Sequence, residues 1–184
     1  EVVGAALTQS PKIDGVIFTG STAVAKEIEK AIAIHTKSII LIAETGGQNA
    51  MIVDSSALPE QVVADVLASA FDSAGQRCSA LRVLCLQTEI ADKTIAMIQG
   101  AMAELKVGNP LNLATDVGPV IDREAQINLQ KHIDQTCQYA VSVTHAPVDE
   151  TAIRHGSFIT PVMIELSDIT ELKQEVFGPV LHVI

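Results

Sequence analysis

The order of local signals between residues 15 and 43 narrows the possible folds of this chain more than any other feature. Gly15–Gly20 is a short run rich in β-forming residues that ends in glycine, Ser21 stands where a helix N-cap belongs, and a helical stretch covers Thr22–Ile34. A second apolar run, Ile39–Ala43, predicts a buried strand. Strand, helix and strand within about thirty residues form a βαβ unit, which builds parallel sheets covered by helices. The predicted fold class is therefore α/β with a parallel sheet.

Short apolar runs and amphipathic stretches continue to alternate downstream. The predicted elements are a strand at Ala50–Val53, a helix at Pro59–Phe71, a strand at Leu81–Leu86, a helix at Glu89–Leu105 and a helix at 122–138. We expect the alternation to reach the end of the chain, where Val180–Ile184 is a predicted strand with nothing after it. A free strand exposes unpaired backbone groups, and the chain opens without an initiator methionine. The sequence therefore predicts a fragment whose fold is incomplete at both ends.

Charge and cysteine content exclude several classes of protein. The 184 residues include 12 Lys and Arg against 22 Asp and Glu, a formal net charge of −10, so this segment is not expected to bind nucleic acid. The apolar runs are far too short to span a bilayer, and no membrane insertion is expected. Three widely spaced cysteines argue against a disulfide framework and favour a reducing compartment. We expect a cytoplasmic protein.

Cys78 is the strongest candidate for chemistry. It lies in the polar, glycine-containing segment 73–80, which is a poor setting for an inert core thiol. Glu44 directly follows an apolar run and precedes two glycines that let backbone approach closely. A cysteine and a carboxylate together suggest covalent catalysis. The alternative is that Cys78 is a small buried hydrophobic side chain and Glu44 a solvated loop acid.

The remaining cysteines and the five histidines lack such a pattern. Cys85 alternates within a strand-like run and Cys137 lies in a predicted helix, so both are interpreted as packing residues. The histidines show no ligand spacing with each other or with the cysteines, and no metal site is predicted. Arg77 has two open interpretations: it activates the neighbouring thiol through its charge, or it forms a surface salt bridge.

Five motifs in register resemble the NAD(P)-dependent aldehyde dehydrogenase superfamily. They are Phe18–Thr22, Glu44–Gly47, Gly75–Cys78, Gly156–Pro161 and Glu175–Val180. The resemblance covers essentially the whole chain. Within the superfamily, the segment 76–82 is most similar to the L-glutamate γ-semialdehyde dehydrogenase branch, and there to the module of the bifunctional bacterial proline utilisation A flavoenzymes.

This resemblance implies catalytic and substrate-binding roles for three residues. Cys78 would be the nucleophile that attacks the aldehyde carbon and forms a thioester, with its own backbone N–H as one oxyanion donor. Glu44 would be the base that activates water to hydrolyse the thioester. Ser79 is the one candidate substrate contact, because its hydroxyl can hydrogen-bond an amino-acid-like aldehyde; otherwise it belongs to a simple turn.

The same resemblance implies four cofactor contacts. Gly20 and Ser21, at the head of a helix, would hold the pyrophosphate of NAD through free backbone N–H groups and a hydroxyl. Glu175 would bind the nicotinamide ribose, and Phe177 would be its apolar neighbour at the nicotinamide. Without the family these residues are an N-cap and a turn before a strand.

The expected function is NAD-dependent oxidation of L-glutamate γ-semialdehyde to L-glutamate in proline catabolism, within a larger enzyme that forms a homo-oligomer. Residues 1–46 would end an NAD-binding domain, and 47–184 would be a truncated, nucleophile-bearing catalytic domain. NADP is an alternative to NAD, and FAD is expected only where a proline dehydrogenase module is present elsewhere in the parent. Two alternatives remain: another semialdehyde or aldehyde dehydrogenase, or a segment without catalytic activity of its own.

Overall fold

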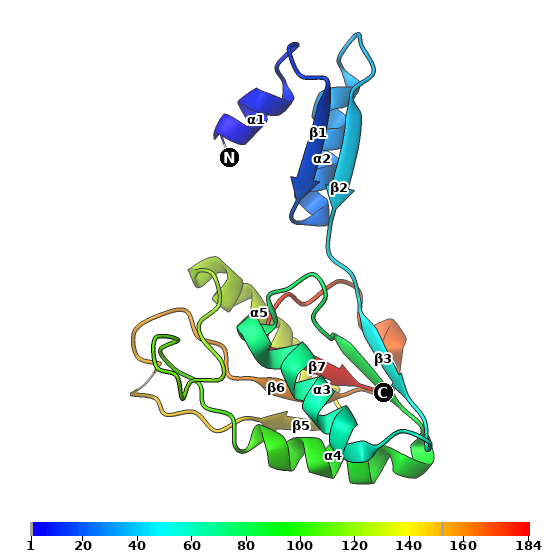
Figure 1. Cartoon of the computed structure of the whole chain (residues 1–184), viewed down its shortest axis with the longest axis vertical. Helices are drawn as coiled ribbons and strands as arrows, with labels where there is room; N and C mark the ends of the chain where they lie inside the picture. Colours follow the sequence, from blue (N-terminus) through cyan, green and yellow to red (C-terminus); the bar gives the residue numbers. More distant parts are fainter. Residues whose placement is uncertain (1, 152) are drawn as a thin grey trace. The chain divides into compact units, whose positions relative to one another are not determined.

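A computed structural model describes residues 2–151 and 153–184 of the chain (Figure 1). Contacts between Cα atoms divide the chain into two compact units, Glu1–Gly47 and Gln48–Ile184. Each unit is built from its own secondary structure. No helix within the described ranges is long and apolar enough to cross a membrane.

The first unit contains the predicted βαβ arrangement. Its elements are α1 (Val2–Thr8), β1 (Gly15–Thr19), α2 (Thr22–Ala33) and β2 (Ile40–Glu44). β1 and β2 pair in parallel, with Thr19 opposite Glu44 at their carboxyl ends. The Ser21 side chain accepts a hydrogen bond from the Val24 N–H at 3.2 Å, which caps α2 as its sequence predicts.

The expectation that the second strand of this unit is buried is wrong for the side chains of β2. Ile40 is 67% exposed and Ile42 is 50% exposed, and Ile17 of β1, opposite Ile42, is 82% exposed. Side chains alternate between the two faces of a strand, and α2 buries its apolar side chains Ala25, Ile28 and Ile32. A two-stranded sheet with one such helix leaves the face that carries these isoleucines open.

The second unit is built on a five-stranded sheet. Its strands are β3 (Ala50–Val53), β4 (Val83–Leu86), β5 (Ser142–His145), β6 (Val162–Glu165) and β7 (Val180–Val183). The order across the sheet is β3-β4-β7-β6-β5. All neighbours pair in parallel except β5 and β6, which are antiparallel. The α/β class with parallel sheets is confirmed, and the antiparallel edge strand adds to it.

The C-terminal strand does not have the free edge that the sequence suggested. β7 lies in the middle of the sheet between β4 and β6, and all four of its residues are buried. The expected alternation with helices is also wrong after residue 136. Among their described residues, the connections from β5 to β6 and from β6 to β7 contain no α-helix, only the short 3-10 turn Ile169–Glu171. These pairings join segments distant in sequence, which local patterns do not specify.

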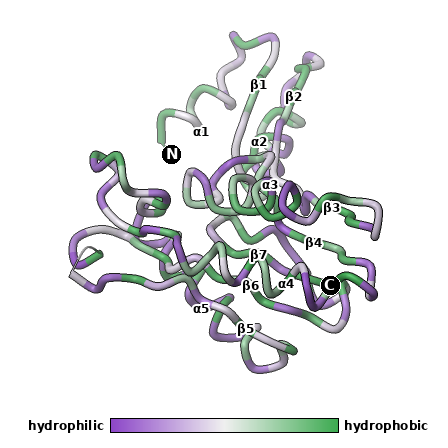
Figure 2. The backbone as a smooth tube through the Cα atoms, turned by 60° about the horizontal axis from the view of Figure 1, so that its bottom comes forward, coloured by the Kyte–Doolittle hydropathy of each residue, from purple (hydrophilic) through white to green (hydrophobic). Residues whose placement is uncertain are grey.

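Three helices pack on this sheet: α3 (Pro59–Phe71), α4 (Thr88–Met102) and α5 (Arg123–Thr136). α3 contacts both α4 and β7 (Figure 1). The core includes Val66, Ile98 and Met102 from the helices, all fully buried. Figure 2 shows hydrophobic residues along β3 and β4, which are neighbours at one side of the sheet.

The two cysteines interpreted as packing residues differ in their environments. Cys85 lies in β4 and is half-buried, which agrees with a strand-packing role. Cys137 is exposed at the C-cap of α5, so the packing interpretation is wrong for it. The helix ends two residues before the predicted residue 138, and this leaves the Cys137 side chain at its end in solvent.

Candidate active site

Four chain segments meet at one edge of the five-stranded sheet. Because β3, β4, β7 and β6 run in parallel, the residues that precede them lie at the same, amino-terminal edge. The segments are 48–49, 75–82, 156–161 and 175–179. Three of the five sequence motifs thus come together within this unit.

Cys78 lies on a strained turn at this edge. The turn follows the 3-10 segment Asp72–Gly75, in which Ser73 (φ 57°), Ala74 (φ 52°) and Gly75 (φ 64°) all adopt the left-handed conformation. A Cβ atom added at Gly75 would lie 2.2 Å from the Gly178 carbonyl oxygen, so glycine is required there by both conformation and space. The turn leaves the Cys78 thiol exposed.

Asn49 fixes the backbone around the thiol. Its Nδ2 group donates to the Cys78 carbonyl at 2.7 Å and to the Ala80 carbonyl at 3.0 Å. The Cys78 N–H has no acceptor among the described residues, so it remains available to a ligand. A side chain from the start of β3 therefore determines how the thiol and its own N–H are presented.

Arg82 is fully buried directly beneath this turn. All four of its terminal N–H groups are used: Nη1 donates to the carbonyls of Gly75 (2.6 Å) and Gly178 (3.3 Å), and Nη2 donates to the Arg77 carbonyl (3.1 Å) and to Glu175 Oε1 (3.3 Å). Burial lowers the pKa of Arg82 from its ordinary value, and the Glu175 carboxylate opposes that shift. The guanidinium joins the Cys78 turn to the segment before β7.

The salt-bridge interpretation of Arg77 is wrong for the described ranges, while its activation of the Cys78 thiol stays a prediction. Its Nη2 donates to the Ala68 carbonyl at 2.8 Å and to the Ser69 carbonyl at 3.4 Å, in the last turn of α3. It forms no salt bridge within the described ranges. Arg77 thus satisfies C-terminal carbonyls of a helix, where a cation also complements the helix dipole.

Ser79 is exposed beside Arg77, on an open hollow of about 390 Å³. The other lining residues include Met51, Asp65 and Asp72. Polar and charged groups thus surround the predicted substrate contact.

Glu175 and Phe177 line a second hollow of about 250 Å³. The Glu175 side chain is largely buried, and only its Oε1 atom is bound, by Arg82. Phe177 remains 43% exposed, with its ring centroid 5.1 Å from the Arg82 guanidinium carbon. Gln76, which precedes the cysteine turn, and His132 of α5 line the same hollow.

His132 and His182 form a buried pair that the sequence did not predict. Their Nε2 atoms are 3.0 Å apart, and the His182 Nδ1 atom lies 3.3 Å from the Arg82 carbonyl oxygen. Burial, followed by repulsion from His132, lowers the pKa of His182 to about 4. Burial also lowers the pKa of His132. Within the described residues, no group of three or more His, Cys, Asp or Glu side chains could hold a metal ion.

The first unit brings together Glu44, Gly20 and Ser21. The Gly20 N–H donates to the Glu44 carbonyl at 3.1 Å, so this amide is not free for a phosphate as the sequence suggested. The N–H groups of Thr22 and Ala23 open α2 without intrahelical acceptors, and the Ser21 hydroxyl lies beside them. Glu44 is exposed at the end of β2. Its convergence with Cys78 stays a prediction.

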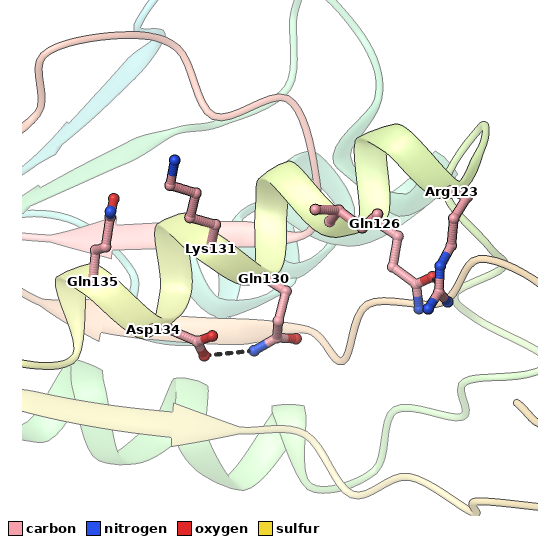
Figure 3. Close-up of a pocket in the computed structure, with 7 residues that line it drawn as sticks. Arg123, Gln126, Gln130, Lys131, Asp134 and Gln135 are labelled. Carbon is pink, nitrogen blue, oxygen red and sulfur yellow. Dashed lines mark hydrogen bonds between the residues drawn. The ribbon is translucent and has the colours of Figure 1, made fainter.

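A third hollow contains none of these residues. It measures about 440 Å³ and is lined only by side chains of α5 (Figure 3), where Gln130 donates to Asp134 at 2.8 Å. We interpret it as a solvated helix face.

Sequence reasoning missed Asn49 and Arg82 as organisers of the site. One signal for Arg82 was present: an arginine inside the apolar run 81–86 must be paired if that run is a buried strand. Asn49 carries no such signal, because an asparagine before a strand is ordinary turn chemistry.

The fold is an α/β sheet with an exposed cysteine at one edge, next to backbone in the left-handed conformation. The model of the aldehyde dehydrogenase family matches residues 1–184, and the chain belongs to this family. It is 57% identical over its whole length to the bifunctional protein PutA of Escherichia coli and to that of Klebsiella aerogenes. The chain spans only 14 to 15% of the length of these curated relatives.

Solved structures agree with this assignment. A crystal structure of proline utilization A from Bradyrhizobium japonicum superposes with a TM-score of 0.93 at 51% identity, over 99% of this chain and 18% of that protein. Betaine aldehyde dehydrogenase of Staphylococcus aureus, solved in complex with NAD⁺, gives a TM-score of 0.88 at 30% identity, over 99% of this chain and 38% of that one.

Proposed function

We propose that this chain is part of a larger enzyme that oxidises L-glutamate γ-semialdehyde to L-glutamate with NAD, through a thioester on Cys78, in proline catabolism. The observation that carries the proposal is the exposed Cys78 thiol on a turn joined through Arg82 to Glu175, one of the predicted cofactor ligands. The similarity to PutA supports the substrate, since 57% identity exceeds the 35% identity to malonate-semialdehyde dehydrogenase of Listeria monocytogenes.

The first chemical step belongs to Cys78. Its thiolate sulfur attacks the aldehyde carbon and forms a C–S bond, while the carbonyl electron pair moves to the oxygen. The free Cys78 N–H supplies one hydrogen bond to that oxyanion. As the C=O bond re-forms, the aldehyde hydrogen leaves with its electron pair, and the carbon becomes a thioester.

Hydrolysis of the thioester is assigned to Glu44. Its carboxylate takes a proton from a water molecule, the water oxygen attacks the thioester carbon, and the C–S bond breaks to regenerate the Cys78 thiolate. The exposed position of Glu44 at the end of β2 leaves its carboxylate accessible to water. The product leaves as a carboxylate.

Each unit, taken by itself, offers groups that suit a part of NAD. The open N–H groups of Thr22 and Ala23, with the Ser21 hydroxyl, suit a pyrophosphate, and the unbound Oε2 of Glu175 suits ribose hydroxyls. The exposed ring of Phe177 offers an apolar surface. When bound, NAD supplies the acceptor for the hydride. NADP is the alternative cofactor.

We extend the proposal to the whole protein as follows. Residues 1–46 would end an NAD-binding domain, and residues 47–184 would be the nucleophile-bearing, truncated catalytic domain. The parent would form a homo-oligomer, with FAD present only if a proline dehydrogenase module accompanies this one. Ser79 would contact the amino-acid end of the substrate.

The test uses the full-length protein, a panel of semialdehydes and simple aldehydes, and the variants Cys78→Ser and Cys137→Ser. We expect the highest kcat/KM with glutamate semialdehyde, a loss of at least about 10⁴-fold in Cys78→Ser, and no loss in Cys137→Ser. Acid-quenched mass spectrometry should detect a thioester on the peptide that contains Cys78. Undiminished activity in Cys78→Ser would refute the mechanism, and a preference for aliphatic aldehydes would refute the substrate.

A further inference from the structure

We propose that Arg82 is a positioning residue that couples the nucleophile turn, residues 75–78, to the cofactor segment, residues 175–178. This inference rests on the proposed function of Cys78 and Glu175. Arg82 does not reach the exposed thiol; it acts through the backbone and side-chain atoms that it binds.

The burial of Arg82 requires an explanation. Its side chain has no exposed surface, and an ion removed from water costs several kcal/mol unless it is paired and hydrogen-bonded. Hydrophobic residues often replace buried ion pairs without loss of stability, so stability alone is a weak reason for this arginine. Its partners offer a better one. Two acceptors lie in the nucleophile turn and two lie in the cofactor segment, 93 and 96 residues away along the chain.

The strained backbone before Cys78 depends on the same guanidinium. Ser73 and Ala74 are in the left-handed conformation, which costs about 1 to 3 kcal/mol for each non-glycine residue and persists only where the surroundings impose it. The Gly75 carbonyl that ends this run accepts the shortest of the Arg82 hydrogen bonds, at 2.6 Å. Arg82 therefore holds the strained turn that presents the thiol.

The cofactor segment is held by the same two terminal nitrogens of the guanidinium. Arg82 binds one oxygen of Glu175 and leaves the other free, and it lies over the ring of Phe177. Nη1 and Nη2 each bridge the two segments, since each donates one hydrogen bond to either side. A lysine ammonium, with one nitrogen and three donors, cannot reproduce this planar fork.

The first experiment compares Arg82→Lys with the exposed control Arg123→Lys in the full-length protein. We expect Arg82→Lys to raise the KM for NAD and to lower kcat/KM by about 10²-fold, because the thiol and the ribose ligand no longer share one support. Arg123→Lys should leave both constants unchanged. A folded Arg82→Lys protein with wild-type kinetic constants would overturn the proposal.

The second experiment needs no catalysis and no change in the buried arginine. Glu175→Gln removes the charged partner of Arg82, and the rate of Cys78 alkylation by iodoacetamide is measured without NAD. Peptide mass spectrometry separates this rate from that of Cys137, the exposed internal control. We expect the alkylation rate of Cys78 to change by at least about twofold, which corresponds to the smallest coupling energies found between residues of one hydrogen-bond network. The alkylation rate of Cys137 should stay constant.

An unchanged Cys78 rate in Glu175→Gln would overturn the coupling even if Arg82→Lys fails to fold. The result is separable from failure of the proposed function, which would appear as a wild-type protein that oxidises no aldehyde with NAD. A change in thiol reactivity in such a protein would still establish the link between the two segments.

Discussion

Lowering the pH from about 7.5 to about 5 is expected to destabilise the unit 48–184 by about 2 kcal/mol through His182. This side chain is 1% exposed and its pKa falls to about 4, because burial and the neighbouring His132 disfavour its charged form. The charge of Arg82, the residue before β4, lowers the pKa of His182 further, while a hydrogen bond to the Arg82 carbonyl raises it.

The sign follows from where the protons bind. In the unfolded chain His182 titrates near 6.5, so between pH 6.5 and about 4 the unfolded state binds a proton that the folded state does not. Stability therefore falls as the pH drops through this window. The loss is about 2 kcal/mol at pH 5 and levels off near 3 kcal/mol below pH 4, at about 1.4 kcal/mol for each pKa unit.

The assay is urea unfolding at several pH values between 8 and 5 for the wild type, His182→Gln and the exposed control His145→Gln. Subtracting the variant curve from the wild-type curve removes the contribution of other groups. We expect the wild-type advantage over His182→Gln to shrink by about 2 kcal/mol from pH 7.5 to pH 5. Parallel curves for these two proteins would refute a neutral, buried His182, whereas His145→Gln should stay parallel to the wild type.

Three further substitutions test the packing around the site. Gly75→Ala should lower the free energy of unfolding in urea by at least about 2 kcal/mol, because residue 75 is in a left-handed conformation and the added Cβ would meet the Gly178 carbonyl. A smaller loss would contradict this backbone conformation. Asn49→Ala should cost about 1 to 2 kcal/mol, since two carbonyls lose their donor, and a neutral result would argue against these hydrogen bonds. Ile98→Val should cost about 1 kcal/mol while the exposed Ile52→Val stays within about 0.5 kcal/mol, and equal losses would place Ile98 outside the core.

The helices and several strands could be predicted because their signals are local. Pro59 marks the first turn of α3, and the helix then runs to Phe71 as its apolar period predicts. Ser21 and Asp122 both accept the N–H of a residue three positions later and so begin their helices. A cap or a period is contained in a few consecutive residues, so sequence reasoning can find it.

The parts that could not be predicted depend on pairing over long distances. The last strand, β7, lies in the centre of the sheet with a partner strand on each side. Nothing in the sequence Val180–Val183 distinguishes a central strand from an edge strand. The His132–His182 pair joins residues 50 positions apart. Cys78 and Glu175 were found through sequence motifs. Arg82 and Asn49 were not, because they bind backbone carbonyls, which every residue has and which therefore leave no pattern in the sequence.

A strained backbone segment, at Ser73 and Ala74, and a buried charge, on Arg82, lie together at this edge of the sheet. Each reduces the energetic cost of the other. A left-handed run at Ser73 and Ala74 turns the Gly75 carbonyl inward, where an unpaired acceptor would be costly. A buried guanidinium would be costly without such acceptors, since few side chains can supply four bonds in one plane. Local rules of sequence are broken at both places, as is typical of functional sites, and the break lies directly beside the exposed thiol of Cys78. The turn and Arg82 therefore stabilise each other. A substitution that disrupts either one should leave the other without its hydrogen-bond partners.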